Sequence, residues 1–377
     1  MSSDTSISYV ASGQIPPSPP PAATTGVMGW MRENLFDGWM NSVLTIVSIA
    51  AIVLIVPPII DWAFLRGVWN AGSLSECREI VAAAHGEGVR GACWAVINER
   101  FNQFLFGFYP THLYWRPILA FVLMFVALAP VLFTQVPRFM LWFSLIYPVV
   151  AFLLIWGGMG LEPVESAKLG GFMLALIIGT TGIVASLPIG ILLALGRQSS
   201  MFFIKTICVI FIEFIRGVPL ITLLFVASVL LNYFLPPGTE FDLILRVCIM
   251  VTLFSSAYMA EVIRGGLAAL PQGQYEAADA LGLNYWKSTR LIIMPQALKV
   301  SIPGIVNSFI GLFKDTTLVS VIGLLDPVGL LNPIRADSNW NGILWELYLF
   351  VALFFFIFCF GMSRYSMYLE RKLKTDR

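Results

Sequence analysis

Long apolar segments separated by short polar stretches run through most of the chain. A transmembrane helix needs ~20 consecutive apolar residues. Five segments without a charged residue reach that length: Gly38–Ile60, Pro117–Pro137, Phe139–Leu161, Leu169–Gly196 and Gly217–Thr239. Three further segments carry charges near their ends or inside: Leu243–Ala260, Val300–Leu325 and Leu347–Ser363. The pattern predicts an all-α polytopic membrane protein with about eight transmembrane helices.

These segments divide the chain into three parts. Residues 1–42 contain the proline-rich run 16–21 and no basic cluster, which is typical of a disordered tail and not of a signal peptide. Residues 43–160 hold three predicted helices and a polar loop at about 66–116. Residues 168–377 hold the other five helices, with a polar stretch at 271–297 between the third and the fourth of them.

The distribution of charge predicts the orientation. Hydrophobic residues make up 58% of the chain and charged residues 12%, as expected for an integral membrane protein. An even number of spans places both termini on one side, and the segment after Ser363 is basic, with Arg364, Arg371, Lys372, Lys374 and Arg377. By the positive-inside rule both termini and the stretch 271–297 are cytoplasmic, and the loop at 66–116 is periplasmic. That loop holds five arginines, but it approaches the length at which the rule loses force.

The polar stretch 271–297 carries a specific motif. Strong helix formers run from Gln274 to Leu281, Gly282 suits a left-handed cap, and Asn284 can cap a second short helix before Pro295. The spacing resembles the EAA loop, by which the membrane subunits of bacterial ATP-driven importers engage their ATPases. The matching residues are Glu276, Ala277, Ala278, Gly282, Ile292 and Pro295, and Met294 replaces the usual leucine. The alternative is an amphipathic loop on the lipid surface.

Three more stretches resemble the permeases of polar amino acid importers of the histidine and glutamine type. They are Glu213–Leu220, which reads Glu-x-x-Arg-Gly-x-Pro-Leu, Ser256–Leu267 before the EAA loop, and Lys314–Gly323 after it. Leu223 stands where that family usually has a glutamine. The resemblance covers residues 168–377 and implies a five-helix type I ABC importer core. The three preceding helices, with Ala92–Ile97 and Tyr114–Pro117, are similar to the M-type permease of general L-amino-acid uptake systems.

This resemblance implies a permease subunit that moves L-amino acids across the bacterial inner membrane. It also implies a second related permease in a heterodimer, two cytoplasmic ABC ATPases and a periplasmic amino-acid-binding protein. ATP and Mg²⁺ would be bound by the partner ATPase, because Trp286 stands where a phosphate-binding loop ending at Lys287 needs glycine. The chain has two histidines and no cluster with metal-ligand spacing, so we predict no metal site, no catalytic residue and no nucleic-acid partner.

Lys314 and Asp315 interrupt an apolar segment, and charges at such positions are expensive and usually functional. With the hydroxyls of Thr316 and Thr317, they have the chemistry to bind the two ends of a zwitterion. The alternatives are a structural ion pair or an interfacial position where both charges stay hydrated.

Cys77 and Cys93 lie together in the loop at 66–116. If that loop faces an oxidising periplasm, the two can form a disulfide, and two free thiols are the open alternative.

Two other classes of function remain for comparison. An ion-coupled secondary transporter is expected to contain inverted repeats, and none is visible in the sequence. A membrane scaffold or sensor has no reason to carry an EAA loop. The sequence therefore favours the importer subunit.

Overall fold

The computed structural model describes residues 26–373, apart from residues 134, 231–232, 234–235 and 237–240. The described part is helical and contains isolated β-bridges but no strand. It divides into two units: the first runs to Gly67 and includes Val81–Ala92, and the second comprises Val68–Ile80 and Cys93 onward. The all-α class predicted from the sequence is confirmed.

The first unit contains α1 (Gly26–Asn34), α2 (Trp39–Ile60) and the π-helical turn η2 (Asp61–Leu65). None of the residues of α2 is buried, although the helix is almost wholly apolar. The predicted disordered tail is wrong for residues 26–34, where apolar residues favour the helix α1 and the Asn34 side chain donates to the Trp30 carbonyl at 2.9 Å. Residues 1–25, which contain the proline run, lie outside the described residues.

The second unit holds most of the helices, and α3 (Leu74–His85) begins in it. The others are α4 (Ala95–Phe106), η3 (Thr111–Leu113), α5 (Trp115–Leu132), η4 (Arg138–Met140), α6 (Leu141–Trp156), η5 (Ser166–Lys168), α7 (Gly171–Gln198), α8 (Phe202–Gly217), α9 (Leu220–Phe225), η6 (Val226–Leu230), α11 (Leu243–Ala268), α12 (Gln272–Ala280), α13 (Tyr285–Ser288), η7 (Thr289–Ile293), α14 (Met294–Asp315), η8 (Thr316–Ile322), α15 (Leu331–Ala336) and α16 (Trp345–Leu373).

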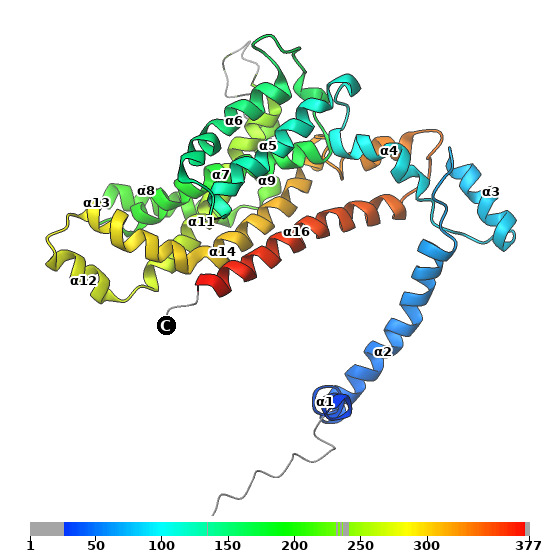
Figure 1. Cartoon of the computed structure of the whole chain (residues 1–377), viewed down its shortest axis with the longest axis horizontal. Coiled ribbons are helices and arrows are strands. Elements are labelled where there is room, and N and C mark those ends of the chain that lie inside the picture. The colour runs from blue at the N-terminus through cyan, green and yellow to red at the C-terminus, as the bar shows by residue number, and fades with distance from the viewer. Residues whose placement is uncertain (1–25, 134, 231–232, 234–235, 237–240, 374–377) are drawn as a thin grey trace, which may run out of the picture. The chain divides into compact units, whose positions relative to one another are not determined.

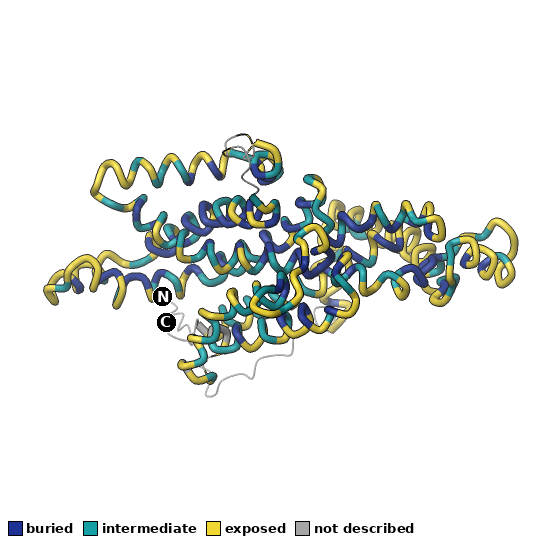
Figure 2. The backbone as a smooth tube through the Cα atoms, turned by 90° about the horizontal axis from the view of Figure 1, so that it is seen from above, coloured by how far each residue is buried: buried dark blue, intermediate teal, exposed yellow. Residues whose placement is uncertain are grey.

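The centre of the second unit is the close packing of α7 on α11, with α14 against α11 and α16 against α14. Small residues of α7 allow this approach, because a side chain at Gly190 would collide with Met259 of α11. The hydroxyls of Ser186 and Ser255 meet between the two helices at 3.1 Å. Buried and exposed positions alternate along the helices (Figure 2), so each packed helix turns one face inward.

Six described helices are long and apolar enough to cross a membrane, and a seventh span results if α8 and α9–η6, bent by 101°, count as one. Two of the eight predicted transmembrane segments do not form one long helix. Phe139–Leu161 forms only the 16 residues of α6, because the chain turns at Gly157 with φ of 85°. Gly217–Thr239 forms α9 and η6, and much of its remainder lies outside the described residues.

Candidate functional site

Helices α12 and α13 form a compact projection, the knob, which comprises residues 272–288. It lies at one end of α11 and α14, and α4 lies at the opposite end of the same unit (Figure 1). The turn between its helices is closed by the Leu283 amide, which donates to the Ala278 carbonyl at 3.2 Å, and the Gly282 amide, which donates to Asp279 at 2.9 Å. This is the Schellman arrangement, and Gly282 takes its left-handed position with φ of 68°.

The second helix of the knob begins as the sequence predicts. The side chain of Asn284 accepts a hydrogen bond from the Lys287 amide at 2.9 Å and so caps α13. The knob is tied back to α14 by Gln296, whose Nε2 donates to Gln274 Oε1 at 3.0 Å. The hydroxyl of Tyr275 donates to the Leu267 carbonyl at 3.4 Å, and burial raises the pKa of this tyrosine. The knob is therefore closed locally and joined to the helices at its base.

The motif residues separate into two sets. Ala278 is fully buried and Ile292 half-buried, whereas Glu276, Ala277 and Pro295 are exposed. Large apolar side chains also face outward on and beside the knob: Leu281 is 73% exposed, Trp286 68% and Leu291 65%. A projection with this much uncovered apolar surface has the character of a protein docking site.

An ion-pair cluster lies at the base of the knob, where α7, α8 and α11 end. Glu261 is paired with Arg197 at 2.8 Å, with Arg264 at 3.1 Å and with Arg216 at 3.6 Å. Arg197 also reaches Glu213 at 2.8 Å. Arg264 lies one helical turn from Glu261, a spacing that the sequence shows, whereas Arg197 was missed because only the fold brings the end of α7 to this carboxylate.

The four candidate substrate residues at the end of α14 are not equivalent. Lys314 is exposed and Asp315 half-buried, and neither forms an ion pair with another described residue. Thr316 is 1% exposed, and its hydroxyl donates to the Phe313 carbonyl at 2.7 Å. The Thr317 hydroxyl donates to the Lys314 carbonyl at 2.8 Å. The charges are therefore available to a ligand, while the Thr316 hydroxyl is enclosed.

Asn307 extends this polar surface along α14. Asn307, Gly311 and Lys314 follow the i, i+4, i+7 spacing of one helix face; Asn307 and Lys314 are exposed, and Gly311 has open space beside it. We call Asn307, Gly311, Lys314 and Asp315 the polar face of α14. Sequence reasoning missed Asn307, although the helical spacing from Lys314 could have found it.

Cys77 and Cys93 form a disulfide, with their Cα atoms 5.9 Å apart. The structure thus adopts the paired alternative and not the free thiols. The amide of Cys93 donates to Oε1 of Glu346 at 3.1 Å, and Glu346 is a buried residue in the first turn of α16. The disulfide is therefore anchored to the start of the last helix.

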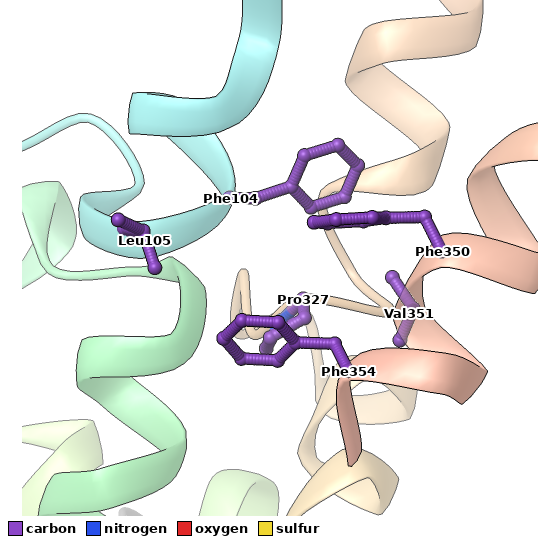
Figure 3. Close-up of a pocket in the computed structure, with 6 residues that line it drawn as sticks. All are labelled: Phe104, Leu105, Pro327, Phe350, Val351 and Phe354. Carbon is purple, nitrogen blue, oxygen red and sulfur yellow. The ribbon is translucent and has the colours of Figure 1, made fainter. Parts of the chain in front are cut away.

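Further contacts join α4 to the segment before α16. Arg100 pairs with Asp337 at 2.6 Å, and Nε1 of Trp340 donates to Glu99 at 3.0 Å. Phe104 at the end of α4 lies against Phe350 of α16, with ring centroids 5.0 Å apart (Figure 3). These contacts join the segments of a second end of the unit, which we call the disulfide end: residues 68–80, 93–106 and 326–346.

Known proteins are similar to this chain over most of its length. The family model for "Binding-protein-dependent transport system inner membrane component" matches residues 186–375. The chain is 54% identical to the "Glutamate/glutamine/aspartate/asparagine transport system permease protein BztC" of Rhodobacter capsulatus, over 99% of each chain. It is 47% identical to the "Inner membrane amino-acid ABC transporter permease protein YhdY" of Escherichia coli K12, over 96% of this chain and 97% of that protein. A chain in the solved structure "Crystal structure of an amino acid ABC transporter with histidines" is 30% identical, with a TM-score of 0.48 over 53% of this chain and 91% of that one.

Proposed function

The chain belongs to the family of inner membrane components of binding-protein-dependent transport systems, and from this premise we propose that it is a permease subunit of an ATP-binding-cassette importer for amino acids. Its two full-length relatives are named as permeases of amino acid transport systems. In this role the chain forms part of the membrane pathway and is not the ATPase. A partner subunit binds ATP and Mg²⁺ and hydrolyses the nucleotide.

The knob is the observation that carries the proposal. It is a locally closed body at the end of the membrane helices, and it presents Leu281, Trp286 and the exposed carboxylate of Glu276 to its surroundings. A cytoplasmic ATPase that binds this surface can transmit its movement to α14 through the base of the knob, where Gln274 meets Gln296. A scaffold or sensor has no use for such a projection.

The experiment replaces Gly282 in the complete transporter. Valine is strained at φ of 68°, whereas asparagine tolerates this region, and nothing lies within 4 Å to collide with either side chain. We expect Gly282→Val to assemble in the membrane but to lose ATP-driven amino acid uptake, and Gly282→Asn to keep most of it. Uptake and membrane assembly are measured together, and normal uptake by assembled Gly282→Val contradicts the coupling role.

The proposed partners follow from the arrangement of the core. One copy of the five-helix core provides one wall of a pathway, so we propose a second related permease in a heterodimer, two ATPases and a periplasmic amino-acid-binding protein. The knob is then cytoplasmic, as are both termini, and the disulfide end is periplasmic. A reporter that is active only in the cytoplasm should work after Arg377 and fail when inserted near Gly86; the reverse result contradicts this orientation.

The polar face of α14 is the proposed route of the substrate. An amino acid carries both charges, and Lys314 and Asp315 offer a cation and an anion that form no ion pair within 4.0 Å with another described residue. We expect Lys314→Met and Asp315→Asn each to lower uptake about tenfold, as for loss of one hydrogen bond to a charged group. Assembly and basal ATP hydrolysis should persist, because neither residue lies in the knob.

The double variant Lys314→Met with Asp315→Asn separates this role from a structural pair. If the two charges only neutralised each other, removing both would restore uptake. We expect no restoration, and Thr316→Val should leave uptake near normal because its hydroxyl is enclosed and bonded to the backbone. Full uptake by a well-assembled double variant contradicts the substrate role.

A further inference from the structure

A large hollow lies between the α5–α6 pair and the core helices. Its volume is about 910 Å³, and its walls come from α5 around Pro117–Met124, α6 around Tyr147–Trp156 and α7 from Phe172 to Ala185, with parts of α11 and α16. Most of these residues are apolar. The α5–α6 pair is therefore not packed against the core along its whole length.

The manner in which α5 and α6 are attached explains the hollow. Both helices are fixed to neighbouring segments at one end, where the Tyr109 hydroxyl donates to the Ile155 carbonyl at 2.8 Å and Arg116 donates to the Glu162 carbonyl at 2.6 Å. Farther along, α5 and α6 are bonded to each other, as by the Ser144 hydroxyl, which donates to the Ala127 carbonyl at 2.6 Å. Beyond the end at which they are fixed, α5 and α6 therefore stand away from α7.

Most of the helices that line the hollow are candidates to cross the hydrocarbon layer. Helices α5, α7, α11 and α16 all belong to segments long and apolar enough to span a membrane. The wall along α7, from Phe172 to Ala185, is about 20 Å long at 1.5 Å per residue. One leaflet contributes about half of the ~30 Å hydrocarbon thickness, so this wall is long enough for one acyl chain.

The wall offers few groups for a polar ligand: Asp242 is its charged lining residue, and no cation among the described residues lines it. Several polar groups of the wall have partners inside the protein. The Thr180 hydroxyl donates to the Leu176 carbonyl at 2.6 Å, and the Tyr147 hydroxyl donates to the Ala120 carbonyl at 2.9 Å. Trp156 Nε1 donates to Ser166 at 2.8 Å, and Asp242 accepts from the Leu245 amide at 3.0 Å. An amino acid would need unpaired charged groups, as on the polar face of α14.

We propose that the hollow binds an acyl chain of a membrane phospholipid, which fills the space between the α5–α6 pair and the permease core. The walls of the hollow supply apolar contacts along the acyl chain, and the bilayer around these helices supplies the lipid. The two additional helices thereby create a lipid site that the five-helix core alone does not contain.

The test uses the full chain in vesicles of phosphatidylethanolamine and phosphatidylglycerol. A small fraction of the phosphatidylethanolamine carries a photoactivatable diazirine in one acyl chain, and modified residues are mapped by mass spectrometry after irradiation. We expect modification of Leu176 and Ile177, which line the hollow on α7. Ala151→Trp places a large ring in the hollow from α6 and should abolish this modification.

The matched control is Val149→Trp, on the same helix but 60% exposed and outside the lining. It should leave the modification of Leu176 and Ile177 unchanged. Absence of modification in the native chain overturns the proposal, whether the hollow is empty or another protein fills it. Modification of Leu176 and Ile177 in Ala151→Trp at the native level also overturns the proposal. If Ala151→Trp fails to assemble, Ala185→Phe, on the opposite wall, repeats the test.

Discussion

The knob and the disulfide end are built in opposite ways. The knob is closed by contacts between residues close in sequence, such as Leu283 with Ala278, and it leaves Leu281 and Trp286 uncovered. The disulfide end is held by contacts between residues far apart, such as Arg100 with Asp337, and its key groups are largely enclosed. A locally closed body with exposed apolar residues suits a partner surface. An end tied by long-range contacts suits a fixed platform for α16.

Two exposed tryptophans, one on the knob and one at the disulfide end, give the strongest test of the contrast between these two regions. Trp286 on the knob is 68% exposed and Trp345, at the start of α16, is 70% exposed. We expect Trp286→Ala to cost the complex 2 kcal/mol or more, about a thirtyfold loss of affinity for the ATPase, because buried tryptophans dominate protein interfaces.

Trp345→Ala is the matched control and should leave ATPase binding unchanged. The measurement is co-purification of the ATPase with each variant, together with ATP-driven uptake. Equal losses in both variants would mean that the two ends do not differ in the way proposed.

The disulfide is expected to matter for stability and not for coupling. Removing both sulfurs with Cys77→Ser and Cys93→Ser frees a loop of 16 residues, for which loop-closure entropy gives about 3 kcal/mol of the free energy of unfolding. Denaturant unfolding in detergent measures this loss, and ATPase binding should persist. Cys208→Ala is the control, since Cys208 is a free cysteine. An unchanged unfolding transition in the double variant contradicts the stabilising role.

The smallest effect concerns pH at the disulfide end. Asp326 is fully buried, and burial raises its pKa to about 6 although the Val328 and Gly329 amides donate to it. A carboxyl whose folded pKa is raised stabilises the fold when protonated, so its contribution is lost as pH rises through about 6. Between pH 5 and 7 the free energy of unfolding should fall by about 1 kcal/mol from this group.

Thermal unfolding at several pH values measures that slope. Asp326→Asn removes the titration and should flatten this slope relative to the unchanged chain. If stability depends on pH in the same way in the unchanged chain and in Asp326→Asn, Asp326 is not the group responsible for this pH dependence.

Sequence reasoning located the knob because its signals are local. Gly282 marks the left-handed turn and Asn284 the following cap, and both act within a few residues of themselves. The same reasoning missed Arg197 in the Glu261 cluster, because residues 64 positions apart meet only once α7 and α11 have packed. It also extended the tail too far, since the apolar residues of α1 were hidden among polar ones.

The sequence by itself determined the membrane class, the apolar segments and the knob, because hydrophobic length and turn residues act through the solvent and the neighbouring backbone. Only the tertiary structure decided the pairing of Cys77 with Cys93, the approach of Arg197 and Arg216 to Glu261, and the burial of Thr316. It also decided that α5 and α6 stand away from α7 and leave an apolar hollow. Each of these depends on how helices distant in sequence pack, which apolar composition leaves open because many arrangements bury similar surfaces.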